Sequence, residues 1–236
     1  QEAFGVVGSV VPVKTTKPIL QNVLLTADDG EITVFATDLE MAAKVQLDAV
    51  KVHKKGSVLL PARECAALLR ELSDPTITLE RVEQRCRLES GGGSFVLLGE
   101  DPDQFPEDAA IKGSKSIKLP AGRMLEMIQQ TAFAAAREET RYAIHGVMLD
   151  MAAGCLRLVA TDGRRLALSY ENLESAKHEF RVIVPLRALS TLARAIPDGS
   201  KEDLDIAVGD KQLEFRFGKV RLLCQLLDSR FPDYEG

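Results

Sequence analysis

Apolar and polar residues alternate along most of this chain in short segments rich in Val, Ile, Leu and Thr, a pattern that predicts β-strands. In the first half, the predicted strands cover residues 22–27, 31–37, 42–48, 57–60, 76–81, 85–89 and 94–98. In the second half, they cover 116–119, 145–151, 155–160, 165–170, 178–184, 203–208, 212–217 and 220–226. Turn residues such as Asp28-Asp29-Gly30 and Gly91-Gly92-Gly93 separate them, so neighbouring strands are expected to pair as antiparallel hairpins.

Helices are predicted at only two places in each half. One pair covers 61–74 and 185–198, and each begins at a proline, which suits the first helical turn because its missing N–H would be unpaired there anyway. The other helix covers about 120–137, and its counterpart in the first half is the opening segment 1–11. The glycines of that opening segment weaken its helical propensity.

The second half of the chain repeats the first at an offset of 124 residues, which drifts to 126 where Phe105-Pro106 recurs as Phe231-Pro232. Ala36-Thr37-Asp38 recurs as Ala160-Thr161-Asp162, and four single residues recur at the same spacing: Val23, Leu25, Gly30 and Pro61 match Val147, Leu149, Gly154 and Pro185. A repeat of this kind makes each copy one folding unit of roughly 120 residues and argues against a single enzyme domain. We expect two domains, 1–112 and 113–236, with the first strand of copy one missing from the chain.

Composition limits the function classes further. With 45% hydrophobic and 28% charged residues, the chain resembles a soluble globular protein. No apolar run approaches the roughly 20 residues that cross a bilayer, and no signal peptide opens the chain, so a cytoplasmic protein is expected. The four cysteines lack CxxC pairing and the three histidines are isolated, which predicts buried reduced thiols, no metal site and no cofactor: Cys65, Cys86, Cys155 and Cys224; His53, His145 and His178.

The two helices that begin at a proline each place two arginines opposite an apolar stripe. Residues three, four and seven positions apart share a helix face. The stripes consist of Cys65, Leu68, Leu69 and Leu72 in copy one and of Leu189, Leu192, Ala193 and Ile196 in copy two. Arg63 and Arg70 lie opposite the first stripe, and Arg187 and Arg194 lie opposite the second at the same places in the repeat. Two interpretations of these arginines are possible from the sequence: an ordinary solvent-exposed helix face, or a face that binds anions.

The net charge of −5 argues against a protein that coats nucleic acid with its whole surface, but it permits one basic surface. Lys14 and Lys17 precede the strands of copy one, and Arg141 takes the place of Lys17 in copy two. Long cations facing phosphates add affinity without reading base sequence. This distribution fits a protein that holds DNA without stopping at a particular site.

Two other readings of the motifs are weaker. Asp38 and Asp162, in two homologous lobes, suggest an aspartic protease, but those enzymes present Asp followed by Thr or Ser and then Gly, whereas here Thr precedes Asp and Leu39 stands where glycine should be. An aspartate that closes a strand more often accepts backbone N–H bonds in a turn. The triple glycine lacks the Gly-Lys-Ser/Thr of a phosphate loop, and no catalytic constellation is predicted.

Four strings, KTTKPILQNVLL, FATDLEMA, ATDGRRLA and SRFPDY, are similar to segments of the bacterial DNA polymerase III beta subunit, the replicative sliding clamp. The resemblance implies an α+β fold of tandem DNA-clamp domains, each with antiparallel sheets outside and two helices on the inner, DNA-facing side. It implies a homodimeric ring, without catalytic activity of its own, that encircles duplex DNA. The expected partners are the replicative polymerase catalytic subunit, the clamp loader, and repair and translesion polymerases. Members carry three such domains, and the third is absent from this chain.

The resemblance also implies two sets of site residues. The DNA-facing set comprises Lys14, Arg63, Arg70, Arg141, Arg187 and Arg194. The second set forms one wall of a hydrophobic pocket for partner peptides and comprises Ile144, Thr161, Gly163, Arg165, Leu166 and Pro232. Arg164 departs from the family, which commonly has histidine at this place. The alternative function is a tandem-domain scaffold that binds peptides in the same pocket but does not encircle DNA.

Overall fold

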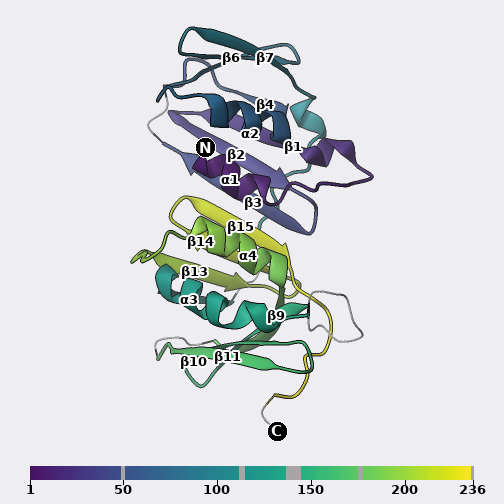
Figure 1. Ribbon diagram of the computed structural model, residues 1–236, viewed down its shortest axis with the longest axis vertical. Helices are drawn as coiled ribbons and strands as arrows, with labels where there is room; N and C mark the ends of the chain where they lie inside the picture. The colour runs from purple at the N-terminus through teal and green to yellow at the C-terminus, as the bar shows by residue number, and fades with distance from the viewer. Residues whose placement is uncertain (49–50, 112–114, 137–144, 175–177, 235–236) are drawn as a thin grey trace. The chain divides into compact units, whose positions relative to one another are not determined.

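The computed structural model describes residues 1–48, 51–111, 115–136, 145–174 and 178–234 (Figure 1). Backbone contacts divide the chain into two compact units, Gln1–Ala109 and Ala110–Gly236, which we call unit 1 and unit 2. The predicted boundary between residues 112 and 113 lies outside the described residues. Each unit combines antiparallel sheets with two α-helices, so the prediction of an α+β fold with antiparallel sheets is confirmed.

Unit 1 contains two sheets. The first has the order β4-β1-β2-β3 and is built from β1 (Asn22–Asp28), β2 (Glu31–Thr37), β3 (Met41–Leu47) and β4 (Gly56–Pro61). The second has the order β5-β6-β7 and is built from β5 (Thr78–Val82), β6 (Arg85–Ser90) and β7 (Gly93–Leu98). Helix α1 (Glu2–Gly8) packs on β2 and β3, and α2 (Ala62–Glu71) packs on β1, β4 and α1. The two 3₁₀ turns are η1 (Pro18–Gln21) and η2 (Pro102–Gln104).

Unit 2 repeats this plan. Its first sheet has the order β12-β9-β10-β11, built from β9 (Gly146–Ala152), β10 (Cys155–Thr161), β11 (Leu166–Asn172) and β12 (Phe180–Pro185). Its second sheet runs β15-β14-β13-β8, from β8 (Lys115–Pro120), β13 (Asp203–Val208), β14 (Gln212–Phe217) and β15 (Val220–Gln225). Helix α3 (Ala121–Thr131) packs on β10, β11 and α4, and α4 (Leu186–Ala195) packs on β12 and β15. A 3₁₀ turn, η3 (Ala132–Ala134), follows α3.

The predicted strands all form, and their ends differ from the predicted ones by at most two residues. The glycine-rich segment is the predicted hairpin turn: β6 ends at Ser90, β7 begins at Gly93, and Gly91 and Gly92 have φ of 56° and 79°. The positive φ favours glycine at Gly91, and a side chain there would also displace the carboxylate of Asp74. No helix in the described part of the chain is long and apolar enough to cross a membrane.

The helices end earlier than predicted. Helix α3 was expected over 120–137 but ends at Thr131, whose hydroxyl donates to the carbonyl oxygen of Met127 at 2.7 Å before the chain tightens into η3. Such back-bonding by threonine competes with regular helix propagation. Helices α2 and α4 end at Glu71 and Ala195, because Leu72 and Ile196 already have extended backbone. The segment 1–11 is helical only over Glu2–Gly8.

The apolar stripes of α2 and α4 differ in depth, although both were predicted as core. In unit 2, Leu189, Leu192 and Ile196 are buried, whereas Ala193 is half-buried. In unit 1 only Cys65 of the predicted stripe is buried, and three leucines are half-buried: Leu68, Leu69 and Leu72. The helix of unit 2 therefore contributes more to its core than its counterpart does.

The thiol prediction needs one correction. Cys65, Cys86 and Cys224 are buried and reduced, and burial raises the pKa of the Cys65 and Cys224 thiols to about 12. Cys155, in contrast, is only half-buried, because it lies at the first position of β10 beside the turn that follows β9. No group of three potential metal ligands occurs among the described residues.

The difference between the two helices can be measured. Leu192 is 1% exposed and Leu68, its counterpart in the repeat, is half-buried. Leu192→Ala is expected to lower the free energy of unfolding by about 2–5 kcal/mol, and Leu68→Ala by roughly 1–2 kcal/mol, because Leu68 loses less apolar contact. Urea unfolding followed by circular dichroism measures both losses. An equal or larger loss for Leu68→Ala would contradict the assignment of the deeper core to α4.

Candidate functional site

The four predicted helix arginines lie on exposed faces at equivalent places in the two units. Arg63 and Arg70 are exposed on α2, where Ala62 and Cys65 form the buried side. Arg187 and Arg194 are exposed on α4, opposite the buried leucines of that helix. Residues seven positions apart lie almost on one line along a helix, so each pair presents its two cations on the same face.

Of the two remaining predicted DNA-facing cations, the structure describes one. Lys14 is exposed in the segment between α1 and η1. Arg141 lies outside the described residues, as does Ile144 of the predicted peptide pocket. The geometry of the other pocket residues can be described in full.

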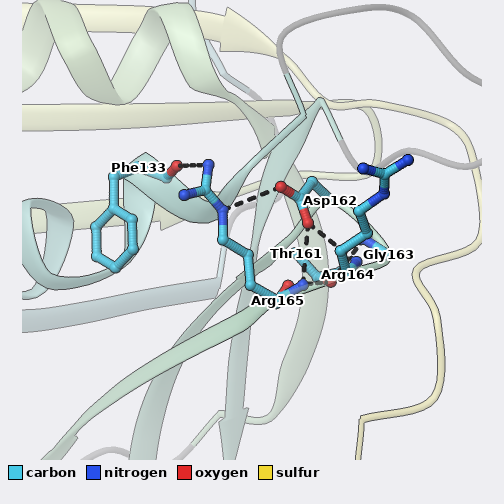
Figure 2. A network of polar contacts seen from close by, with 6 residues as sticks. All are labelled: Phe133, Thr161, Asp162, Gly163, Arg164 and Arg165. Atoms are coloured by element: carbon cyan, nitrogen blue, oxygen red, sulfur yellow. Dashed lines mark hydrogen bonds and ion pairs between the residues drawn. The ribbon is translucent and has the colours of Figure 1, made fainter.

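Four of those pocket residues lie in one tight turn, residues 161–166, between β10 and β11. Figure 2 shows Thr161, Gly163 and Arg165 in this turn. The Thr161 hydroxyl donates to the carbonyl oxygen of Arg165 at 2.7 Å and accepts the N–H of Gly163 at 3.0 Å. Gly163 has φ of +83°, a left-handed conformation that favours glycine. These bonds tie the start of the turn at Thr161 to its middle at Gly163 and to its end at Arg165.

Asp162 holds the same turn from within. One of its carboxylate oxygens, Oδ1, accepts the backbone N–H groups of Arg164 and Arg165, each at 3.0 Å. The other oxygen, Oδ2, pairs with Nε of Arg165 at 3.0 Å. The two backbone hydrogen bonds, helped by the charge of Arg165, lower the pKa of Asp162 below its ordinary value. Asp162 is thus a turn-forming residue, as the sequence predicted.

The equivalent turn of unit 1 has the same frame but different contents. The Thr37 hydroxyl donates to the carbonyl oxygen of Met41 at 2.8 Å, and Asp38 Oδ1 accepts the N–H groups of Glu40 and Met41. Leu39 takes the left-handed position that glycine has in unit 2, with φ of 78°. Both aspartates are occupied by turn amides, an arrangement of structural and not proteolytic aspartates.

Arg165 fastens the turn to the end of α3. Its guanidinium donates to the carbonyl oxygen of Phe133 at 2.9 Å and lies 5.7 Å from the centre of the Phe133 ring (Figure 2). Phe133 belongs to η3, directly after α3, and its ring is exposed. Sequence reasoning missed Phe133, and no local signal marks it, because its role depends on a contact with a residue 32 positions away.

An apolar strip of surface continues from the turn along β11. Leu166, Leu168 and Tyr170 alternate with inward-facing residues, and they are exposed by 50%, 42% and 57%. The opposite face of β11 meets α3, since Ser169 bonds to Gln130 and Glu171 to Arg123. Leu166 is therefore a surface residue and not part of the core. We call Leu166 and Leu168 the apolar patch beside the turn.

Pro232, the remaining predicted pocket residue, belongs to a different part of unit 2. It lines a hollow of about 880 Å³ between β12 and the C-terminal segment 226–234, together with Met148, Ile183 and Phe231. Leu227 donates its N–H to the carbonyl oxygen of Ile183 at 3.0 Å, which joins this segment to β12. The structure thus gathers Thr161, Gly163, Arg165 and Leu166 in one turn and places Pro232 in the wall of the hollow.

A buried carboxylate fastens the C-terminal segment. Asp150, only 2% exposed, pairs with Arg181 at 2.7 Å and accepts a hydrogen bond from the Tyr234 hydroxyl at 2.7 Å. Burial by itself would raise the pKa of Asp150, but the bonds from Arg181 and Tyr234 outweigh burial and lower this pKa below the ordinary value of 3.8. An acidic residue inside the apolar run Gly146–Ala152 was the sequence signal for this group, and our sequence analysis did not use it.

The Asp150 contacts predict a pH-dependent stability. A carboxyl group whose pKa is lowered by folding stabilises the protein above its unfolded pKa and loses that contribution as the pH falls through the folded pKa. Asp150→Asn should therefore lower the free energy of unfolding by about 1.5–3 kcal/mol at pH 7, and the difference should shrink below about pH 4. Urea titrations between pH 7 and pH 3 measure it, with Tyr234→Phe as the variant expected to lose less. A difference that stayed constant down to pH 3 would contradict this account.

Comparisons with known proteins agree with the two-unit plan. A family model of the DNA polymerase III beta subunit N-terminal domain matches residues 2–109, and a model of the central domain matches residues 118–233. The beta sliding clamp of Synechococcus elongatus is 32% identical over 237 residues, covering 98% of this chain and 63% of that protein. The beta sliding clamp of Pseudomonas aeruginosa is 30% identical over 231 residues, with 97% and 63% covered.

Solved structures give the same answer. The sliding clamp of Bacillus subtilis matches with a TM-score of 0.91 and 28% identity, covering 99% of this chain and 64% of that one. The Pseudomonas aeruginosa sliding clamp bound to griselimycin matches equally well, with a TM-score of 0.91, 28% identity and the same coverage, 99% and 64%. The chain spans about 63% of the length of the curated relatives it matches. It belongs to the family of bacterial DNA polymerase III beta subunits and carries the N-terminal and central domains of that family.

Proposed function

We propose that this chain is part of a DNA sliding clamp, a processivity factor that encircles duplex DNA and tethers the replicative polymerase to it. The observation that carries the proposal is the repetition of two exposed arginines at equivalent places on α2 and α4. A protein that contacts a long duplex evenly needs equivalent cationic surfaces in its successive domains. Family membership supplies the same expectation independently.

The chemistry of these arginines suits sliding. A guanidinium at the end of a long side chain attracts phosphate oxygens whatever the base sequence, and such contacts exchange easily between neighbouring phosphates. The net charge of −5 does not attract DNA to the chain as a whole, and we assign the attraction to the arginine-bearing faces. Lys14, also exposed, is proposed to add a contact at the rim of this surface, and Arg141 is proposed to do so in the second domain.

Closure of a ring requires further surfaces. In unit 1, β7 lies at the end of the sheet order β5-β6-β7 and exposes Val96 and Leu98. An edge strand with exposed apolar residues pairs readily with a strand from another chain. We therefore propose β7 as one ring-closing surface of a homodimer. The polypeptide that completes the ring lies in the part of the family's length that these 236 residues do not span.

The turn after β10 is proposed to receive partner peptides. Its backbone is held by Thr161 and Asp162, and the apolar patch beside it offers side chains against which an extended peptide can bury apolar residues. The proposed owners of such peptides are the replicative polymerase catalytic subunit, the clamp loader, and repair and translesion polymerases. The clamp would then act as a non-catalytic accessory subunit in the cytoplasm, associated with the nucleoid.

A topological test separates this function from that of a scaffold that does not encircle DNA. The full-length protein is loaded by its clamp loader onto nicked circular DNA, and its retention is measured by gel filtration before and after the circle is cut. Retention on the circle and rapid loss from the linear product are expected, because a closed ring leaves DNA only over an end. Equal loss from both forms would overturn the clamp function and favour the scaffold.

The helix arginines can be tested separately. Replacing Arg187 and Arg194 together by Glu should lower loading onto circular DNA by at least about tenfold at low salt, because two phosphate-facing cations become anions. The matched control, Lys201→Glu with Lys211→Glu, makes the same total charge change at exposed sites of unit 2 outside α4. Unfolding by urea should be unchanged in both variants. Equal loading by the arginine variant and the control would contradict the placement of α4 against DNA.

A further inference from the structure

The two neighbouring arginines of the turn after β10 have different surroundings. The guanidinium of Arg165 pairs with Asp162 and bonds to the carbonyl oxygen of Phe133. Arg164 uses only its backbone N–H, which donates to Asp162 at 3.0 Å. Figure 2 shows its side chain extending away from the turn, and no hydrogen bond or ion pair joins its guanidinium to another residue within the described part of the chain.

The backbone that carries Arg164 is fixed, even though its guanidinium is exposed. Gly163 on one side is held by the Thr161 hydroxyl, and Arg165 on the other side is held by Asp162. The carboxylate of Asp162 already accepts two backbone N–H groups and the Nε of Arg165. Three hydrogen bonds within the turn engage Asp162, and the side chain of Arg164 extends outward from this rigid base (Figure 2).

This cation lies next to apolar surface. Leu166, two residues further along, is half exposed, and Leu168 continues the same face of β11. Unit 1 offers a natural contrast: the equivalent turn has Glu40 in place of Arg164 and Ala42 in place of Leu166. The combination of an apolar patch with an outward-pointing cation at its edge is therefore specific to unit 2.

We propose that Arg164 is a specificity-determining residue, which selects partner peptides carrying a carboxylate next to their apolar anchor residues. This inference rests on the proposed function of the turn as a peptide site. A guanidinium accepts a carboxylate with two parallel N–H···O bonds, whereas an amide of the same shape offers only a neutral acceptor. Since the site is exposed, the preference for an acidic peptide over its amide counterpart should be about two- to fivefold.

The experiment uses the full-length protein and a display library of random octapeptides. Peptides selected on the unmodified protein should contain apolar residues with Asp or Glu beside them. For the best peptide, fluorescence anisotropy then measures the Kd of the acidic form and of the form with Asn or Gln in its place. The acidic form should bind about two- to fivefold more tightly at low salt, and the ratio should approach one in about 1 M salt.

Three variants distinguish the possible failures. In Arg164→Gln the ratio between the two peptides should fall to one, because the acidic peptide loses more affinity than the amide peptide. The control Lys201→Gln should keep the original ratio. Leu166→Asp should abolish binding of both peptides. If no peptide is selected, or if Leu166→Asp leaves binding intact, the proposed peptide site falls and this inference falls with it. Two outcomes would overturn the inference alone. In the first, both peptides bind the unmodified protein with the same Kd. In the second, the acidic peptide keeps its advantage over the amide peptide in Arg164→Gln.

Discussion

Each unit of this protein depends on one packing constraint: its helices must bury one face against antiparallel sheets and leave the other in water. Helices α2 and α4 satisfy it with small and aliphatic residues on the buried side. A ten-residue helix has little stability of its own, so this burial is what holds it in place. The exposed face is then free to vary, and in both units it carries arginines seven positions apart. One side of each short helix therefore stabilises the unit, and the opposite side carries the charges.

The internal repeat explains where the two units may differ without losing their fold. Thr37 and Asp38 close the turn after β2 with the same hydrogen bonds that Thr161 and Asp162 make after β10. Because these bonds involve backbone groups, the side chains between them are not constrained by the turn. Unit 2 uses that freedom for two arginines, one of which becomes a structural link to η3. The repeat thus supplies the backbone frame, and substitutions within one turn supply the side chains of the proposed peptide site.

Much of this could be predicted from the sequence, because strand alternation, a proline directly before a helix and a regular repeat offset are local or periodic signals. The turn role of Asp162 was predictable for the same reason. The contacts that depend on distant residues were not: the bond from Arg165 to Phe133 and the Asp150 pair with Arg181 join segments about 30 positions apart. Nor could the sequence reveal that Leu68 is shallower than its counterpart Leu192, since both fit the same apolar stripe.

The distribution of charge bears on how the proposed clamp can stay on DNA and still move along it. In the proposed clamp, exposed arginines on a chain with a net charge of −5 would attract phosphates without the close, desolvated contacts that would hold one register. Peptide recognition has the opposite requirement, because a partner must be held at one place. As the proposed peptide site, the turn after β10 has a backbone fixed by Thr161 and Asp162 and apolar surface beside it. In the proposed function, loose electrostatics on the helices and rigid geometry at the turn would therefore serve two different kinds of binding.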